Sequence, residues 1–538
     1  MGQSKTGGDK AGPLGQSYQP VRAPRGNQLN CQGWPQEAAL RMLMNSLDEE
    51  VAEQPRDLIA CGATEKVLRN WDCYHATVKA LKDLKDDETL VVQSGKPAGV
   101  LETHKAVPRV LIANSSLAGS WTYVGTQGTL PTAFQTFDAV GWKHFGGNLA
   151  GKLIVSGGMG AAGGALPLAA GLLGAAFLGI DVDSERIKRR IRAGFCDYCV
   201  NTLDEALRIL KNTVRQRQAV SVGLVGNCAD VIPELASRGV VPDILTDQTS
   251  AHDLLNGYVP SGLNTQEATT LRREGPKEYL NRVRGTMARH LEGMLALETL
   301  GSVVFEFGNN IQAAAHECGV GESAYAFPGF VAAYLQPLFS EGLAPVRWVA
   351  LSGEPGDIHR FDDLALALFP DDAMLARWIP LARKYVKFQG LPARVCWLGP
   401  EARIVLAEHL NSLVAEGAVK APFVIAMDPM GSGLEASPQA EPEGMKDKSE
   451  AACDWPILNA LLDTASGASW VSLANGAGYC QASVALVADG APETAKALPN
   501  VLKNDYALGI LRLAGAGHEK AQDTARRTRL KVLMPDKP

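Results

Sequence analysis

The most informative apolar stretch of the chain is Leu153–Ile180, where no charged side chain occurs. Leu153–Val155 are apolar enough for a buried strand, and a glycine turn, a helix and a second strand follow, closed by Asp181. A carboxylate at that position can accept hydrogen bonds from ribose hydroxyls. Small residues in the turn let backbone N–H groups approach a pyrophosphate at a helix N-terminus. The turn has the G-x-G-x-x-G spacing of dinucleotide-binding proteins, with Gly158, Gly160 and Gly163. The segment therefore predicts a dinucleotide site.

A close-packed glycine turn and a membrane span are the other interpretations of this segment. A span needs roughly 20 apolar residues with few helix breakers. Residues 153–180 contain eight glycines and Pro167, and charged clusters flank them on both sides. This composition favours a soluble βαβ unit.

Further apolar segments predict alternating strands and helices on both sides of this unit. The predicted helices cover residues 37–47, 229–238, 278–300 and 456–463. The predicted strands cover residues 89–92, 109–112, 220–225, 244–246, 347–351, 394–398 and 423–426. Asn227 and the run from Asp247 to His252 follow two of these strands, so we expect them to meet at the carboxyl edge of a parallel sheet, where ligands bind.

The charge balance argues against large anionic partners. Charged residues make up 20% of the 538 residues and the net charge is −6, which leaves no basic surface for nucleic acid or an anionic membrane. We therefore expect a small-molecule substrate, with no nucleic acid or membrane partner. The N-terminus has no positive region followed by an apolar core, so no secretory signal is visible. Gly2 and Thr6 match a short acylation pattern, but a solvated leader is the favoured interpretation.

The ten cysteines are dispersed along a long chain, which indicates reduced thiols and a cytoplasmic protein. Cys196 and Cys199 form the one C-x-x-C motif, and no second pair or C-x-x-H accompanies it. Four ligands are the rule for structural zinc, so we expect no metal.

Ten sequence blocks in chain order, from about Pro20 to about Gly515, resemble urocanases, that is, urocanate hydratases. Such a series is far more specific than one glycine motif. The blocks include GWPQEAALRMLMNSLDEEVAE from Gly33, AGSWTYVGTQG from Ala118, VGLVGNCADVIPEL from Val222, TDQTSAHDLLNGYVP from Thr246, RWVALSGEP from Arg347 and LPARVCWLG from Leu391.

The resemblance implies an enzyme that holds NAD⁺ tightly and uses it as an electrophile, so that water adds to urocanate. The product is 4-imidazolone-5-propanoate, a step of histidine degradation, and there is no net redox change. The resemblance also implies a homodimer. Such a site must orient two rings, neutralise a carboxylate and supply a proton donor and acceptor.

The resemblance also assigns site residues. Its cofactor positions are Gly62, Gly158, Gly160, Gly163, Asp181, Arg186, Asn227, Cys228, Gln248, Thr249, Ser250, Ala251, His252, Tyr258 and Gly478. It places Cys396 beside the nicotinamide, Arg347 on the substrate carboxylate and Asp428 in proton transfer. Without the resemblance, an inert buried cysteine, a salt-bridged arginine and a strand-capping aspartate are the favoured interpretations of these three.

Several positions depart from the family pattern. Cys61, Leu166, Phe307, Gln336, Met427 and Ala440 stand where tyrosine, glutamine or arginine is usual, and the segments near 114–118 and 474–483 are shortened. Each change removes a polar group. Three alternatives therefore stay open: a hydratase of a thio- or methyl-urocanate, a non-catalytic NAD-binding relative, and an ordinary dehydrogenase.

Pattern and resemblance together predict an α/β protein in which a Rossmann-like dinucleotide-binding domain is inserted between the N- and C-terminal parts of a larger α/β core. We expect a disordered leader over residues 1–20 and an N-terminal α/β domain over 21–128. A Rossmann-like NAD-binding domain should follow over 129–340, and a C-terminal α/β domain over 341–538.

Overall fold

The computed structural model describes residues 18–427, 453–476 and 479–533. Most of the predicted leader lies outside these residues. So do Asp428 and Gly478, two of the predicted site residues.

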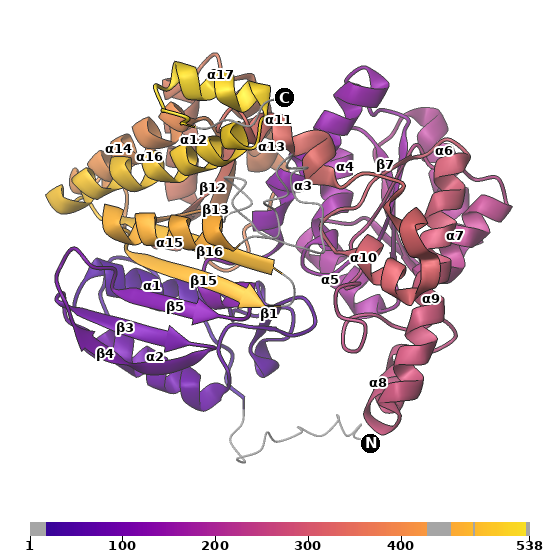
Figure 1. Ribbon diagram of the computed structural model, residues 1–538, viewed down its shortest axis with the longest axis horizontal. Coiled ribbons are helices and arrows are strands. Elements are labelled where there is room, and N and C mark those ends of the chain that lie inside the picture. The colour runs from indigo at the N-terminus through magenta and orange to yellow at the C-terminus, as the bar shows by residue number, and fades with distance from the viewer. Residues whose placement is uncertain (1–17, 428–452, 477–478, 534–538) are drawn as a thin grey trace, which may run out of the picture.

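A parallel sheet forms the middle of the chain (Figure 1). Its strand order is β11-β10-β6-β7-β9-β8, with every neighbouring pair parallel. The strands are β6 (Leu153–Gly157), β7 (Ala176–Asp181), β8 (Tyr198–Val200), β9 (Ser221–Val225), β10 (Ile244–Asp247) and β11 (Val303–Val304). From β6 the chain adds β7, then β8 at the edge of the sheet and β9 between these two, and it returns to place β10 on the other side of β6. This reversal is a topological switch point, where open α/β sheets bind ligands.

Helices connect these strands and bury them. They are α4 (Leu166–Leu172), α5 (Ser184–Ala193), α6 (Leu203–Gln216), α7 (Cys228–Ser237), α8 (Thr265–Glu274) and α9 (Pro276–Thr299). β6 and β7 are buried along their whole length, as the charge-free run in the sequence predicts for strands covered on both faces.

A mixed sheet joins the two ends of the chain. Its order is β13-β12-β14-β16-β15-β5-β3-β4. The N-terminal part supplies β3 (Glu88–Gln93), β4 (Lys96–Glu102) and β5 (Val110–Asn114), and the C-terminal part supplies β12 (Ala344–Ala350), β13 (Ala393–Leu398), β14 (Phe423–Met427), β15 (Trp470–Gly476) and β16 (Tyr479–Ala488). β5 and β15 pair in parallel, with Val110 opposite Trp470. The parallel-sheet domain is therefore inserted within a larger α/β core, which confirms the predicted fold.

A further short helix of the parallel-sheet domain, α10 (Ile311–Ala315), packs on α9. The remaining helices lie around the mixed sheet or join the two parts. They are α1 (Trp34–Asn45), α2 (Trp71–Asp83), α3 (Thr126–Phe145), α11 (Gln336–Phe339), α12 (Pro355–Leu368), α13 (Ala373–Tyr385), α14 (Pro400–Ala415), α15 (Asp454–Ser466), α16 (Pro492–Gly515) and α17 (Glu519–Arg527). A two-stranded sheet of β1 (Ile59–Cys61) and β2 (Glu65–Lys66) lies in the N-terminal part. One apolar core runs from the parallel-sheet domain to α16, so the two parts share buried surface.

The expectation that the thiols are reduced is wrong for one pair. Cys453, just before α15, and Cys480 of β16 form a disulfide. Their Cα atoms lie 5.7 Å apart, within the range that a disulfide spans. The other eight cysteines are not disulfide-bonded.

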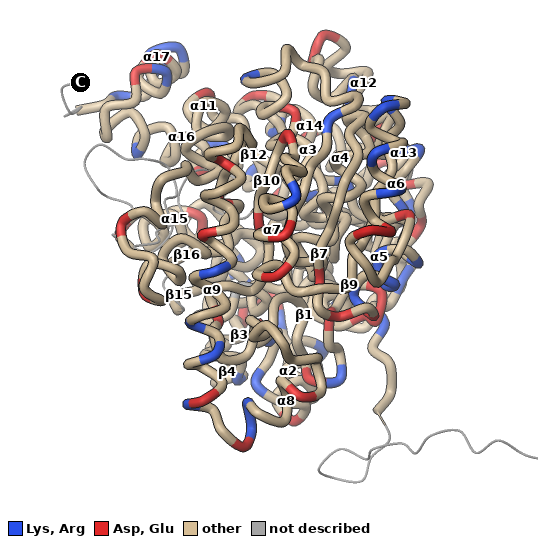
Figure 2. The backbone as a smooth tube through the Cα atoms, turned by 90° about the vertical axis from the view of Figure 1, so that its right-hand side faces the viewer, with Lys and Arg blue, Asp and Glu red and all other residues tan. Residues whose placement is uncertain are grey.

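The surface carries both signs of charge. Figure 2 shows Lys and Arg interspersed with Asp and Glu over the face toward the viewer. No helix in the described part of the chain combines the length and the apolar composition needed to cross a membrane.

Candidate active site

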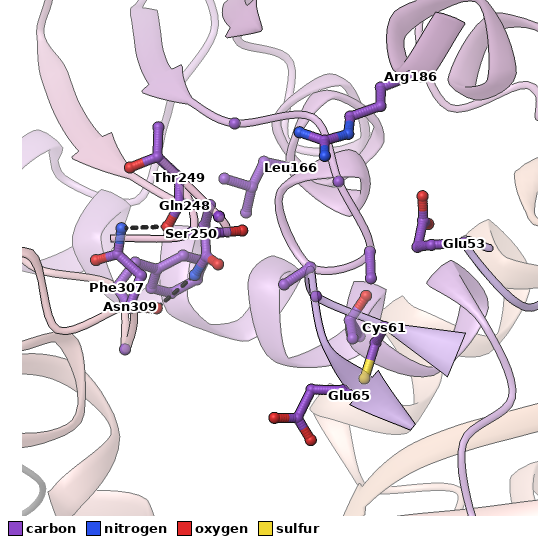
Figure 3. Close-up of a pocket in the computed structure, with 18 of the residues that line it drawn as sticks. Glu53, Cys61, Glu65, Leu166, Arg186, Gln248, Thr249, Ser250, Phe307 and Asn309 are labelled. Atoms are coloured by element: carbon purple, nitrogen blue, oxygen red, sulfur yellow. Dashed lines mark hydrogen bonds between the residues drawn. The ribbon is translucent and has the colours of Figure 1, made fainter. Parts of the chain in front are cut away.

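A cavity of about 730 Å³ lies between the two sheets. The parallel-sheet domain contributes the glycine turn and the carboxyl ends of its strands, and the mixed sheet contributes Arg347, Val395 and Ala426. The N-terminal part adds Glu53, Cys61, Gly62 and Glu65. Figure 3 shows Glu53, Cys61 and Glu65 on one side of the cavity, and Gln248, Asn309 and Phe307 on the other.

The glycine turn after β6 requires glycine at two positions. Gly158 has φ +77°, and an ideal Cβ there would lie 2.3 Å from the Gln248 carbonyl oxygen. A Cβ on Gly163 would lie 2.1 Å from the Gly158 carbonyl oxygen. Gly160 lines the cavity, and a Cβ there would meet nothing within 4 Å. The turn is thus closely packed on one side and open to the cavity on the other.

Asp181 ends β7, the strand position predicted from the sequence, and its side chain lines the cavity. Its carboxylate accepts hydrogen bonds from the N–H groups of Met159 at 2.7 Å and Asp183 at 2.9 Å, and Arg186 lies 3.6 Å away. Burial raises the pKa of Asp181, and the nearby Arg186 opposes this shift. A carboxylate offers about four acceptor sites, so Asp181 keeps capacity for a ribose hydroxyl.

Asn227 and Cys228 begin α7 at the end of the adjacent strand. The Asn227 side chain accepts from the Ala229 N–H at 3.0 Å and donates to the Val259 carbonyl at 2.9 Å. Cys228 is buried, and this burial raises the pKa of its thiol well above the usual value. Both residues line the cavity.

The turn after β10 forms a rim of the cavity beside the glycine turn. Gln248, Thr249, Ser250, His252 and Tyr258 line the cavity. The Gln248 side chain donates to the Phe307 carbonyl, and Thr249 donates its N–H and hydroxyl to Asp247. Ala251 is fully buried in the core of the parallel-sheet domain and does not line the cavity.

Arg347 reaches the cavity from the mixed sheet. It lies on β12 opposite Val395 of β13 and Ala426 of β14, and all three residues line the cavity. An ideal Cβ on Gly128 of α3 would lie 3.8 Å from the Arg347 Nε atom. The mixed sheet thus brings a guanidinium to the cavity lining.

Cys396 lies on the other face of the same sheet. It pairs with Val346, whereas its neighbour Val395 pairs with Arg347. Successive residues of a strand point to opposite faces, so the Cys396 side chain points away from the cavity. It is fully buried in the main hydrophobic core, and burial raises the pKa of its thiol. We therefore correct the prediction that this thiol faces the cofactor: Cys396 is a core residue behind the sheet.

The sequence did not indicate a role for Glu53, which lines the cavity, or for its partner Arg190. Glu53 pairs with Arg190, whose Nε donates to the Met159 carbonyl at 3.0 Å and whose NH1 donates to Thr126 at 2.8 Å. Arg190 thereby fastens the glycine turn to the N-terminal part. Its signal in the sequence is only a cluster of basic residues after Asp181, which is also typical of a solvated helix face.

The sequence also did not predict the contact between two aromatic side chains of the cavity. Phe307 and Phe330 line the cavity and pack edge to face, with ring centroids 4.7 Å apart. Phe307 lies on a segment without regular structure and Phe330 directly precedes a short π-helix (Val331–Leu335), so no shared periodicity brings them together.

Comparison with known families agrees with this arrangement. The urocanase N-terminal domain matches residues 21–154, the urocanase Rossmann-like domain matches residues 125–334, and the urocanase C-terminal domain matches residues 337–527. The chain belongs to the urocanase family. Membership supports a urocanate hydratase-type function, a lyase activity of histidine degradation.

Proposed function

We propose that this urocanase-family chain binds NAD⁺ in the cavity and catalyses the addition of water to urocanate, giving 4-imidazolone-5-propanoate with no net redox change. The observation that carries the proposal is the cavity itself, which is lined by a dinucleotide-type glycine turn from the parallel-sheet domain and by Arg347 from the mixed sheet. The glycine turn can thus bind a dinucleotide, and the Arg347 guanidinium can bind the carboxylate of a substrate.

The residues present fit NAD⁺. The turn leaves backbone exposed at Gly160, where a phosphate can approach closely. Asp181 lies at the end of β7, where ribose hydroxyls bind in dinucleotide folds. The volume of about 730 Å³ is within the range of ligand sites.

Bound NAD⁺ supplies an electron-poor ring that activates the substrate. The protein's own contribution is orientation: the Arg347 guanidinium suits a bidentate grip on the propenoate carboxylate. Phe307 and Phe330 give the cavity an apolar wall against which a flat imidazole packs and which excludes water. Asp428 stays the candidate for proton transfer and lies outside the described residues.

A modified urocanate is the second candidate substrate, and the cavity wall favours it. Cys61, Leu166 and Phe307 all line the cavity, so three positions where the family pattern has polar side chains present sulfur or hydrocarbon instead. Such a wall suits a sulfur- or methyl-bearing ring better than it suits additional hydrogen bonds.

Ultraviolet absorbance tests both candidates. Urocanate, a thio-urocanate and a methyl-urocanate are mixed separately with purified protein without added NAD⁺. Loss of the conjugated absorbance with urocanate supports the proposal, and loss with only a modified ring supports the second candidate. Bound NAD⁺ with turnover of none of the three indicates a non-catalytic relative and overturns both.

Arg347→Gln is the matched variant for this assay. Loss of a charge-assisted contact to the substrate costs about 1.5–3 kcal/mol, which raises KM roughly 10- to 100-fold. Arg360→Gln is the control, because Arg360 is exposed and bonds only the Ala418 carbonyl among the described residues. An unchanged KM in Arg347→Gln would remove Arg347 from substrate binding.

A further inference from the structure

Three residues that can ligate metals converge beneath the glycine turn. Cys228 begins α7, Asp247 ends β10 and His290 lies on α9. The Cys228 sulfur, an Asp247 carboxylate oxygen and a His290 ring nitrogen all lie within 4.8 Å of one another. Across the described ranges, this is the one such cluster of three or more potential ligands.

Two atoms of the cluster lack hydrogen-bond partners. Asp247 Oδ1 and His290 Nε2 are both fully buried and make no hydrogen bond. They lie 3.7 Å apart, which is too long for a hydrogen bond between them. Buried polar atoms are almost always satisfied, so an unsatisfied acceptor facing an unsatisfied nitrogen indicates a missing partner between them.

The charge balance favours a cation as that partner. The other Asp247 oxygen accepts from Thr249 and Asn309, which are both uncharged. A buried carboxylate without a formal counter-charge is costly, and a bound cation removes that cost.

The surroundings resemble the outer shell of a metal site. The Tyr258 hydroxyl lies 2.9 Å from His290 Nδ1, and a proton on Nδ1 that the hydroxyl accepts leaves Nε2 with a free lone pair. Gly157 lies over the cluster, since an ideal Cβ there would be 2.1 Å from Asp247 Oδ1 and 2.7 Å from the Cys228 sulfur. Cys228 and Tyr258 also line the cavity, which provides an entry path.

We infer that Cys228, Asp247 and His290 form a binding site for one divalent transition-metal ion of the zinc class. One sulfur, one nitrogen and one oxygen ligand suit Zn²⁺ or Co²⁺ and not Mg²⁺ or Ca²⁺, which prefer oxygen alone. On binding, the Cys228 S–H releases its proton to solvent and the thiolate forms the metal–sulfur bond, with no change in oxidation state. The ion connects α7, β10 and α9 directly behind the cofactor turn.

This site goes beyond the proposed function, because water addition does not require it. It also differs from the expectation that the chain binds no metal, which rested on the C-x-x-C motif alone. Spacing along the chain cannot reveal the cluster, since Cys228, Asp247 and His290 come from three separate elements.

Cobalt binding tests the inference. Full-length protein is treated with a chelator, exchanged into chelator-free buffer and titrated with Co²⁺ while the thiolate-to-cobalt charge-transfer absorbance is followed. We expect about one Co²⁺ per chain with a thiolate band that Zn²⁺ abolishes by displacement. Cys228→Ser should eliminate the band, whereas Cys199→Ser, which disrupts the C-x-x-C motif, should leave it unchanged.

Two further variants separate ligation from folding. His290→Gln should abolish stoichiometric binding, and Tyr258→Phe, which removes only the outer hydroxyl, should weaken Co²⁺ affinity roughly 10- to 100-fold. Circular dichroism of each variant confirms that it is folded before titration. The inference is overturned if the folded wild type binds no Co²⁺ stoichiometrically, if the band survives in Cys228→Ser, or if it is lost in Cys199→Ser.

Discussion

The Asp181 carboxylate accepts a hydrogen bond from the Met159 N–H at 2.7 Å, which ties the end of β7 to the glycine turn after β6. The sequence motif assigns this acid to a ribose, and the structure adds a second role. Asp181 holds the turn in shape before any ligand binds. Preorganisation of this kind lowers the ordering cost of binding.

Gly158→Val should destroy the dinucleotide site. Residue 158 has φ +77°, and a Cβ would lie 2.3 Å from the Gln248 carbonyl oxygen, so the turn must shift away from the β10 rim. The conformation alone costs about 1–2 kcal/mol for a residue with a Cβ. We expect loss of copurifying NAD⁺, measured by mass spectrometry of the released nucleotide.

Gly171→Ala on α4 is the control for this variant. A Cβ at Gly171 meets nothing within 4 Å and Gly171 does not line the cavity, so the turn should keep its shape and its NAD⁺. Equal NAD⁺ content in Gly158→Val and wild type would show that the close packing at Gly158 is unrelated to cofactor binding.

Arg190→Met should destabilise the junction between the glycine turn and the N-terminal part. Only 1% of the Arg190 side chain is exposed and 10% of that of Glu53, so the variant leaves a buried carboxylate without its main partner. Removing one member of a buried pair costs about 3–5 kcal/mol. Denaturant unfolding measures this change.

Arg282→Met provides the comparison for a surface pair. Arg282 and Glu278 are half-exposed on α9, and such pairs contribute less than about 0.5 kcal/mol. Similar losses in the two variants would contradict the anchoring role of Arg190.

Cys396→Ala should leave turnover intact, because the Cys396 side chain points away from the cavity. We expect kcat/KM within about twofold of wild type and a loss of about 1 kcal/mol in the free energy of unfolding, from lost packing. Steady-state kinetics on the substrate identified by the absorbance assay measure the first quantity. A large fall in kcat at unchanged stability would restore the predicted role beside the cofactor.

Asp463→Asn should stabilise the protein at high pH. Both Asp463 carboxylate oxygens are buried without hydrogen-bond partners, and burial together with Asp505 raises the pKa of Asp463 well above its usual value. The folded state therefore holds a proton that the unfolded state releases above its ordinary pKa. Because of Asp463, the free energy of unfolding falls by about 1.4 kcal/mol per pH unit as the pH rises from about 3.9 toward the raised pKa of this carboxyl.

Asparagine removes this linkage. Thermal unfolding at pH 5 and pH 8 should show a gain in Tm for Asp463→Asn over wild type that is larger at pH 8. A gain that is equal at the two pH values would show that Asp463 does not titrate abnormally.

The inserted parallel-sheet domain was predictable because the residues that determine it lie close together in the sequence. Buried strands, the glycine turn and Asp181 follow one another within a single βαβ unit, and the structure begins β6 at the predicted Leu153 and ends β7 at the predicted Asp181. The predicted helix over 278–300 likewise matches α9 (Pro276–Thr299). In these segments local periodicity and the tertiary environment agree.

Other elements were not predictable from local pattern. α3 and α16 contain Pro131 and Pro499, which are normally helix-breaking signals, and tertiary packing overrides them. The cavity wall formed by Arg347 depends on the register of β12 against β13 and β14, and a shift of one residue exchanges the faces. This register is why Arg347 reaches the cavity while Cys396 does not.

The most direct test of the account is to denature the purified protein and identify the released nucleotide by mass spectrometry. The account predicts roughly one NAD⁺ per chain in wild type and little in Gly158→Val, as expected for a resident cofactor on the glycine turn. Folded wild-type protein that carries no NAD⁺ and binds none when it is added would contradict it.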